Sequence, residues 1–387
     1  MRRQSGILLH ISSLPSRYGI GSLGQAAYQF VDFLEASGQT LWQVLPIGVT
    51  GFGDSPYQSF STFAGNPYFI DLEELLEQDL LEPAEVQAAS QNGSVDRVEY
   101  GMLFETRLPL LKKAALRGYG RYGAEEQDFY RENEDWLPDY SLFMALKKHF
   151  SQKPYWEWPK EIRDREESAM EHYRELLAED IRSAEFNQFL FDRQWRDLKE
   201  YASRHEVEII GDLPIYVAED SADTWSHPEL FMLDENRRPT EVAGVPPDAF
   251  SAEGQLWGNP IYNWAKHKET RYAWWVRRLE KAVERHDLVR IDHFRGFAGY
   301  YSVPGGSVNA IGGEWKKGPG MDLFRTLKEH ISTEALIAED LGVLDESVRN
   351  LLEGTGLPGM KVLLFGFDGD DSEYLCHNYT YNSVAYI

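Results

Sequence analysis

"LVRIDHF", residues 288 to 294, begins with aliphatic residues and ends with charged and aromatic ones. A run of this length suits a parallel strand that is covered on both faces, and the charged residues mark where that strand ends. Six other runs have the same format, in which aliphatic residues give way to a turn and then to a helical stretch: "GILLHISSLP" (6–15), "LWQVLPIG" (41–48), "VEIIGDLPIYV" (207–217), "ALIAEDLG" (335–342), "KVLLFGF" (361–367) and "SVAYI" (383–387). This alternation of strand and helix predicts an α/β fold with a parallel sheet.

Seven strands in this order favour a (β/α)8 TIM barrel over an open doubly wound sheet. No Gly-x-Gly-x-x-Gly turn follows the first strand, which weakens the dinucleotide-binding alternative. We expect residues 1–387 to form a catalytic barrel that is incomplete at its C-terminus, because the chain ends on the seventh strand and a barrel of this kind closes with eight. Two insertions are expected, a mostly helical subdomain at 73–185 and a region of long loops at 218–266 over the active site.

Charge and cysteine content restrict the partners and the compartment. The formal net charge of −24 repels phosphate backbones and anionic lipids, so neither nucleic acid nor a membrane surface is an expected partner, whereas a neutral substrate is not repelled. The single cysteine, Cys376, excludes an internal disulfide and suits a reducing compartment. No stretch has the length of a signal-peptide core or of a membrane span, so a cytoplasmic protein is expected.

Three of the seven runs end with an acidic residue where the aliphatic stretch stops. These residues are Asp212 in "IIGDLP", Asp292 in "VRIDHF", and Glu339 with Asp340 in "IAEDLG". The C-terminal ends of barrel strands carry the catalytic side chains, so the acids are expected to meet over one cleft. Paired carboxylates of this kind carry out glycoside chemistry.

The neighbours of these acids indicate a division of labour. Arg290 lies two residues before Asp292 and therefore on the same strand face, where its charge favours the ionised carboxylate of a nucleophile. Glu339 follows the apolar residues 336–338, and an apolar setting raises the pKa of a carboxyl into the range of a general acid. A retaining mechanism requires the two carboxyl groups about 5 to 5.5 Å apart. Asp292 would then form a glycosyl intermediate, while Glu339 protonates the leaving oxygen and later deprotonates the acceptor.

Structural roles are the competing interpretation. An acid at a strand end commonly caps the following helix or pairs with a nearby arginine, and His10 and His293 are typical of hydrogen-bonded structural residues that are also able to contact a sugar hydroxyl. Asp292 and His293 are potential metal ligands, but no His- or Cys-rich motif accompanies them, so neither a metal nor a cofactor is expected. The glycine-rich loop at 303–320 lacks a phosphate-loop Gly-Lys-Ser/Thr pattern, which argues against a nucleotide site.

Several long blocks carry a family resemblance. They are "GILLHISSLPSRYGIGSLG", "SPYQSFSTFAGNPYFIDL", "EIIGDLPIYVAEDSADTW", "GVPPDAFSAEGQLWGNPIYNW", "RIDHFRGF" and "IAEDLG". On these blocks, which span nearly the whole chain, the sequence resembles the amylomaltases, the 4-α-glucanotransferases of glycoside hydrolase family 77. The resemblance implies that Asp292 is the nucleophile and Glu339 the acid/base. It also implies that Asp212 and Arg290 belong to the same sugar-binding subsite.

The resemblance assigns aromatic and polar residues to the glucan as well. Tyr57 matches a tyrosine that stacks on the ring being cleaved, and Phe250, Gln255 and Trp257 match a loop that closes over the bound glucan and helps to select the acceptor. An aromatic face packs well on the C–H face of a glucose ring, and Tyr57 and Trp257 lie in loop-like contexts where a purely structural role is less expected. For Phe250, which follows two prolines, pinning of its own loop is the competing role.

The implied function is transfer of α-1,4-glucan segments between maltooligosaccharides by a glycosyltransferase of carbohydrate metabolism. Its expected partners are maltooligosaccharides and α-glucans derived from starch or glycogen. The family carries a third catalytic acid in a Thr-His-Asp-Asn-Asp segment just beyond the seventh strand, where this chain ends. Two alternatives stay open: an α-amylase-type hydrolase, which has the same carboxylates but lets water attack the intermediate, and maltooligosaccharide binding without turnover by the truncated chain.

Overall fold

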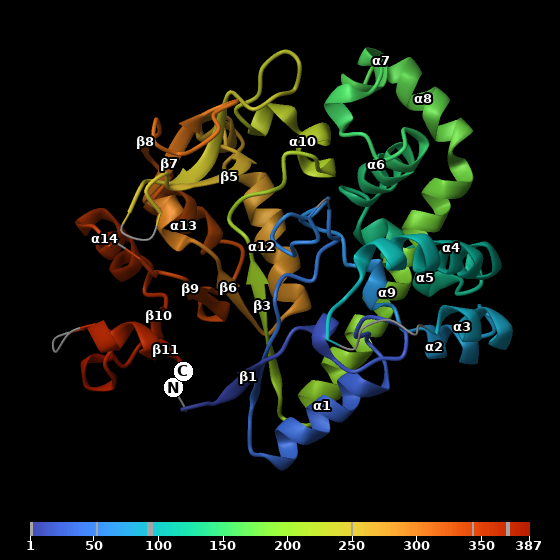
Figure 1. The fold of residues 1–387 in the computed structure, drawn as a ribbon, viewed down its shortest axis with the longest axis horizontal. Coiled ribbons are helices and arrows are strands. Elements are labelled where there is room, and N and C mark those ends of the chain that lie inside the picture. Colours follow the sequence, from blue (N-terminus) through green and yellow to red (C-terminus); the bar gives the residue numbers. More distant parts are fainter. Residues whose placement is uncertain (1–2, 52, 91–95, 249–250, 343, 369–371) are drawn as a thin grey trace. The chain divides into compact units, whose positions relative to one another are not determined.

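A computed structural model describes residues 3–51, 53–90, 96–248, 251–342, 344–368 and 372–387. The chain forms two compact units, one made of Met1–Ile209 with Asp220–Ser226 and the other of Ile210–Glu219 with His227–Ile387. Figure 1 gives the element labels, and its colours follow the chain from the blue N-terminal part to the red C-terminal part.

Each of the seven predicted runs contains a strand, and these strands form a single sheet. They are β1 (Gly6–Leu8), β2 (Leu41–Gln43), β3 (Glu208–Leu213), β6 (Leu288–Ile291), β9 (Leu336–Ala338), β10 (Gly359–Val362) and β11 (Ser383–Tyr386), in the order β1-β2-β3-β6-β9-β10-β11. In the run 361–367 only the first two residues belong to the strand, and Leu363–Asp368 forms a 3-10 helix instead. The registered pairs are parallel. The order follows the sequence, as in a (β/α) barrel, so the predicted fold class is confirmed for the strands that the chain contains.

Strand β3 belongs to both units. In the first unit the Glu208 N–H donates to the carbonyl of Thr40, just before β2, at 2.9 Å. In the second unit the residues from Ile210 to Leu213 pair in register with β6. Most aliphatic residues of β3 and β6 are buried, as their continuous hydrophobic runs predicted: Ile209 and Ile291 are 0% exposed and Val289 is 1% exposed, while Leu288 is partly buried.

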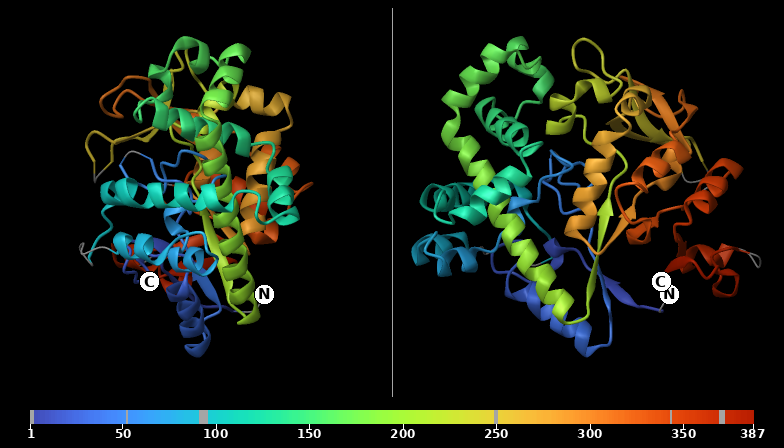
Figure 2. Two further views of the ribbon diagram at one scale, coloured as in Figure 1. Left: turned by 90° about the vertical axis from the view of Figure 1, so that its right-hand side faces the viewer. Right: turned by 180° about the vertical axis from the view of Figure 1, so that it is seen from behind.

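The first unit is mainly helical between β2 and β3. Its helices are α1 (Gln25–Ala36), α2 (Leu72–Glu77), α3 (Pro83–Ala89), α4 (Tyr100–Gly118), α5 (Ala124–Glu132), α6 (Leu137–His149), α7 (Lys160–Arg163), α8 (Glu167–Leu176), α9 (Ala178–Arg204) and α10 (Ala222–Ser226). Helix α9 is the long yellow-green helix of Figure 2, and α1, α4, α5, α6 and α8 pack against it. Its buried face carries apolar residues at helical spacing, among them Phe186, Phe189 and Leu190. The proposed insertion limits of 73–185 stay a prediction.

The second unit carries a further sheet, which the sequence analysis did not identify. Strands β4 (Glu241–Val245), β5 (Gln255–Pro260), β7 (Gly299–Pro304) and β8 (Glu314–Lys317) form an antiparallel sheet in the order β5-β4-β7-β8. The region 218–266, expected as long loops, therefore contains two strands, and the glycine-rich stretch 303–320 contains the end of β7 and all of β8. Val242, Tyr301, Val303 and Ala310 form the small core of this sheet.

The helices of the second unit connect the strands of the large sheet. They are α11 (Trp264–Glu269), α12 (Ala273–Arg285), α13 (Met321–Leu327) and α14 (Glu346–Thr355). Helix α12 packs against β6 (Figure 1). Helix α14 is well delimited: the Asp345 carboxylate accepts from the N–H groups of Ser347 and Val348, and Gly356 ends the helix with a φ of 72°, a conformation that glycine adopts at little cost.

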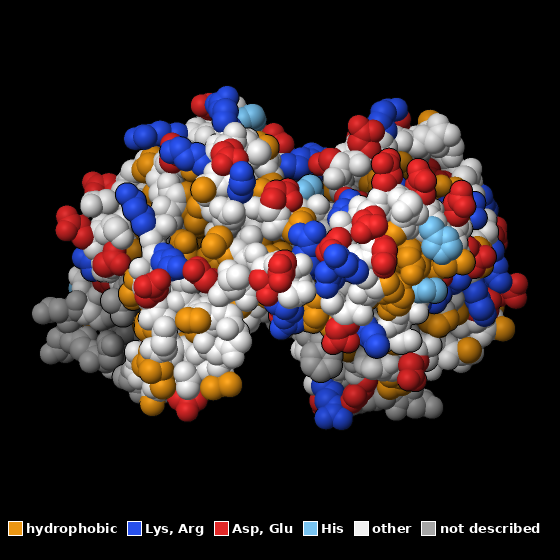
Figure 3. All heavy atoms as spheres, turned by 90° about the horizontal axis from the view of Figure 1, so that it is seen from above, with side chains coloured by type: hydrophobic (Ala, Val, Ile, Leu, Met, Phe, Trp, Pro, Cys, Tyr) orange, Lys and Arg blue, Asp and Glu red, His pale blue; other side chains and the backbone are white. Residues whose placement is uncertain are grey.

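Charged side chains of both signs are mixed on one face of the molecule. In the face shown in Figure 3, acidic and basic side chains are interspersed, although the sequence carries a net charge of −24. Among the described residues, no helix has the length and apolar character needed to cross a membrane.

Candidate active site

Strands β3, β6 and β9 bring four of the predicted site residues together. Asp212 on β3 and Arg290 on β6 are direct partners in the parallel register, and Arg290 is in turn the partner of Ile337 on β9. Beyond the strands, the Asp292 N–H donates to the carbonyl of Leu213 at 2.9 Å. Because the three strands run in parallel, their C-terminal ends place Asp212, Asp292 and the residue after β9, Glu339, at the same edge of the sheet.

Arg290 links two of the acids. Its Nη1 lies 2.6 Å from Oδ1 of Asp212, and its Nη2 lies 3.0 Å from Oδ1 of Asp292. The Asp212 side chain is 1% exposed, whereas that of Asp292 is 27% exposed. Asp292 is therefore the carboxylate of the pair that an incoming group is able to reach, and Asp212 acts mainly on Arg290.

The Glu339 carboxylate is anchored by the backbone. Its Oε2 accepts from the His293 N–H at 2.7 Å, and its Oε1 accepts from the Leu341 N–H at 2.9 Å. His293, the residue directly after Asp292, has a φ of 48°, in the left-handed region that few non-glycine residues occupy. This sharp turn after β6 lets the chain present a backbone donor to Glu339, and backbone strain of this kind is typical of functional sites.

Burial raises the pKa of both carboxyls. For Glu339 the charge of Asp292 raises the pKa further, while Arg290 and the two backbone donors oppose the shift. For Asp292 the charge and hydrogen bond of Arg290 lower the pKa, as the sequence predicted, but burial outweighs them and the pKa is raised. For Arg290 burial lowers the pKa, but Asp212 and Asp292 outweigh burial and raise it. Glu339 is therefore an acid with a raised pKa, and the neighbouring Asp292 is a carboxylate whose ionised form is favoured by the positive charge of Arg290.

An aromatic wall adjoins these groups. The rings of Trp257 and His293 meet edge to face, with centroids 4.8 Å apart. The ring centroid of Trp257 also lies 6.3 Å from that of Tyr216. The indole N–H of Trp257 donates to the side-chain oxygen of Gln255 at 3.1 Å. Burial and the nearby Arg295 lower the pKa of His293 to about 4, so its ring is neutral at pH 7. Tyr216 was missed in the sequence because it lies in a segment whose apolar character indicated only a strand.

The other predicted residues belong to the first unit or fall outside the described residues. Tyr57 belongs to the first unit, where it is half-buried in a turn. His10, also in the first unit, is buried with its ring edge to face against Phe69 at 5.3 Å, and burial lowers its pKa to about 4. Phe250 lies outside the described residues. Roles for Tyr57 and Phe250 stay predictions.

Arg290 is expected to contribute strongly to stability. Replacing it in Arg290→Leu leaves the buried carboxylate of Asp212 without its cation, and removing one partner of a buried ion pair costs roughly 3 to 5 kcal/mol. The free energy of unfolding, measured by urea denaturation at pH 7, tests this. The control is Arg238→Leu, which breaks a more exposed pair with Glu219 and is expected to cost less than about 1 kcal/mol. Equal losses in the two variants would contradict the assignment.

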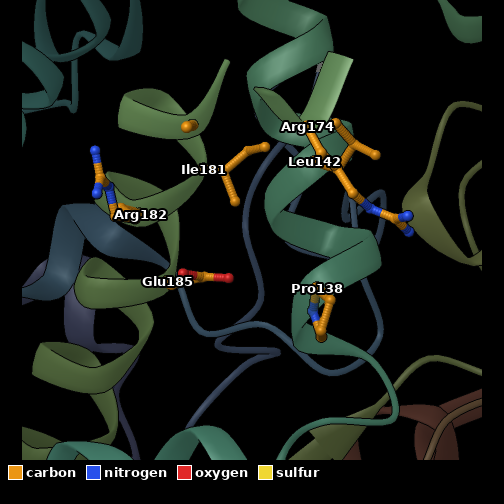
Figure 4. Close-up of a pocket in the computed structure, with 7 residues that line it drawn as sticks. Pro138, Leu142, Arg174, Ile181, Arg182 and Glu185 are labelled. Atoms are coloured by element: carbon orange, nitrogen blue, oxygen red, sulfur yellow. The ribbon is translucent and has the colours of Figure 1, made fainter. Parts of the chain in front are cut away.

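A pocket of the first unit offers a different kind of lining. It has a volume of about 300 Å³ and lies between α6, α8 and α9 (Figure 4). Its lining is mostly aliphatic with one carboxyl: Pro138, Leu142, Arg174, Ala178, Ile181, Arg182 and Glu185. It contains no aromatic ring, no pair of carboxyls and none of the predicted site residues, so it does not suit glycoside chemistry.

Across the described residues, no group of three or more His, Cys, Asp or Glu side chains is arranged to hold a metal ion. The arrangement at the sheet edge thus consists of a partly exposed carboxylate paired with a partly buried arginine, a second carboxyl with a raised pKa, and an aromatic wall.

Comparisons with known proteins show the family of the chain. The family model described as 4-alpha-glucanotransferase matches residues 9–387. The chain belongs to the 4-alpha-glucanotransferase family. A 4-alpha-glucanotransferase of Clostridium butyricum is 47% identical over 380 residues, which cover 98% of this chain and 78% of that protein. One of Thermus thermophilus is 49% identical over 383 residues, covering 97% and 75%.

Solved structures of the 4-alpha-glucanotransferase family share the fold. An amylomaltase from Streptococcus agalactiae, solved in complex with acarbose, matches with a TM-score of 0.96 and 46% identity over 99% of this chain and 78% of that one. The amylomaltase of Corynebacterium glutamicum matches with a TM-score of 0.81 at 18% identity, over 99% and 54% of the two chains. The latter likeness concerns the fold alone.

Proposed function

We propose that this member of the 4-alpha-glucanotransferase family transfers α-1,4-glucan segments between maltooligosaccharides by a retaining mechanism. The observation that carries the proposal is the pairing at the sheet edge: Asp292 in contact with Arg290, and Glu339 held by the N–H of the residue after Asp292. The two carboxyls have different surroundings, which is what a nucleophile and an acid/base require.

In the first step Asp292 attacks the anomeric carbon of the donor glucan. A bond forms between its Oδ and C1, the bond between C1 and the glycosidic oxygen breaks, and the protonated Glu339 gives its proton to that oxygen. The Arg290 charge favours ionised Asp292 before attack. The raised pKa of Glu339 favours the protonated acid.

In the second step the 4-hydroxyl of an acceptor glucan attacks C1 from the opposite side. Glu339, now ionised, takes the hydroxyl proton as the ester bond to Asp292 breaks, and the new linkage keeps the α configuration. The charge of Asp292 is restored as Glu339 is protonated again. Each carboxyl thus ends the cycle in the state in which it began.

The proposed glucan contacts follow from the wall beside the carboxyls. Trp257, next to His293, supplies an apolar face for a glucose ring, and Gln255 supplies a polar group beside it. Tyr57 and Phe250 are proposed to contact the same glucan. Maltooligosaccharides and starch- or glycogen-derived α-glucans are the proposed substrates, and the single cysteine supports a cytoplasmic location.

Product analysis with maltotriose tests the proposal in the full-length protein. Transfer predicts glucose together with maltopentaose and longer chains early in the reaction, with few new reducing ends. A hydrolase instead releases glucose and maltose with a steady gain of reducing ends. Binding of maltoheptaose without any product would support a glucan-binding protein and overturn the proposal.

A further inference from the structure

We propose that Met360 is a positioning residue for the nucleophile, because its thioether fixes the guanidinium of Arg290. The Arg290 Nε–H donates to Sδ of Met360 at 3.2 Å. The inference rests on the proposed function, since it assigns a role to a residue that acts on Asp292 through Arg290. Met360 lies on β10 and reaches Arg290 from a strand 70 residues later in the chain.

All three nitrogens of the guanidinium have a partner. Nη1 meets Asp212, Nη2 meets Asp292, and Nε meets Met360. The donors of a guanidinium are fixed in one plane, so three partners on different segments leave no freedom to rotate about the end of the side chain. Without the third partner the group is able to pivot on Asp212, its more deeply buried contact.

The sulfur suits this position because it is neutral. A thioether is a weak acceptor that satisfies a buried N–H without adding charge. A carboxylate in its place would compete with Asp292 for the arginine and would reduce the effect of Arg290 on the pKa of Asp292. The contact with Met360 therefore orients Arg290 without weakening the electrostatic interaction of Arg290 with the two acids.

The backbone of Met360 is bound by Asp340, just after β9. The Met360 N–H donates to Oδ1 of Asp340 at 2.7 Å, and Asp340 directly follows Glu339. Both residues are buried, Met360 with 5% and Asp340 with 2% of its surface exposed. A Cβ on Gly359 would lie 2.6 Å from Oδ2 of Asp340, so a side chain at position 359 would push this carboxylate away from the strand.

These contacts form a closed circuit around the two carboxyls. Asp292 contacts Arg290, Arg290 contacts Met360, and Met360 is bound by the residue next to Glu339. Glu339 closes the circuit through its bond to the N–H of the residue after Asp292. The relative placement of nucleophile and acid/base thus depends on Met360, although Met360 carries neither charge nor catalytic proton.

The test compares Met360→Leu with Met360→Gln in the full-length protein. Leucine keeps the apolar volume but removes the acceptor, whereas glutamine restores an acceptor through its amide oxygen. With α-maltosyl fluoride as donor, whose fluoride leaves without a proton from Glu339, kcat/KM is expected to fall about tenfold in Met360→Leu. The acid limb of the pH profile is expected to move up by about half a pH unit, because a loosened Arg290 lowers the pKa of Asp292 less. Met360→Gln is expected to bring the acid limb back.

Met170→Leu is the matched control. Met170 is also 5% exposed, on α8 of the first unit, and its replacement makes the same chemical change. A packing role for Met360 predicts a wild-type acid limb in the leucine variant and a less stable glutamine variant, with no rescue by glutamine. That result would overturn the inference. The proposed function would still stand, provided that the wild-type protein is active. An inactive wild-type protein would instead count against the proposed function.

Discussion

Asp292→Asn is expected to abolish glucan transfer, with kcat for maltotriose lowered roughly 10⁴-fold or more. An amide oxygen is a poor nucleophile, so no ester forms at C1. The amide keeps the size of the side chain and still accepts from Arg290, so the fold and glucan binding are expected to persist. Rates of maltopentaose formation from maltotriose, with calorimetric titration of maltoheptaose, measure the two effects separately.

The control for Asp292→Asn is Asp322→Asn, which makes the same change in net charge on α13. The Asp322 side chain is 47% exposed and pairs with Lys268, so near-normal transfer is expected. Asp292→Ala with sodium azide adds a chemical test. Azide is expected to attack α-maltosyl fluoride from the face that the carboxylate has vacated, giving β-maltosyl azide as fluoride leaves. Retained transfer in Asp292→Asn, or an azide of α configuration from Asp292→Ala, would refute the nucleophile assignment.

Hydrophobic pattern alone was enough for the large sheet and for the acids that end its strands. Runs such as 288–294 are aliphatic because both faces of a parallel strand are buried, and Asp292 directly follows Ile291, the last residue of β6. The small antiparallel sheet lacks this signal. Strand β8, "EWKK", is largely exposed and charged, and β4, "EVAGV", is short and close to prolines, so neither has a run to detect.

Contacts that depend on strand register were out of reach of the sequence. The bond from Arg290 to Met360 and the bond from His293 to Glu339 join residues separated by 70 and 46 positions. The pKa of Asp292 shows the same limit: the arginine two residues earlier predicted a lowered value, but burial, which no local pattern measures, raises it. The chemistry-bearing residues and the sheet edge that they share were therefore predictable, whereas the contacts set by strand register and the effect of burial were not.

Glu339→Gln is expected to slow transfer from maltotriose by about 10³-fold, because the leaving oxygen then departs without a proton. With α-maltosyl fluoride the first step needs no acid, so Asp292 is expected to be glycosylated at nearly the wild-type rate. The intermediate should then accumulate, since no base deprotonates the acceptor. Mass spectrometry of the peptide that contains Asp292 measures this accumulation.

Azide products and pH profiles also distinguish the role of Glu339 from that of Asp292. Azide needs no deprotonation, so in Glu339→Gln it is expected to attack the accumulated ester and release α-maltosyl azide, the opposite anomer to that expected from Asp292→Ala. In the wild type, burial and the charge of Asp292 raise the pKa of Glu339. Transfer from maltotriose should therefore fall at high pH as Glu339 loses its proton. Release of fluoride from α-maltosyl fluoride should show no such fall, because it needs no acid. The control, Glu334→Gln, alters an exposed residue just before β9 and should leave both donors unaffected. An equal loss with both donors in Glu339→Gln would show that Glu339 supports the nucleophile or the fold instead of moving the proton.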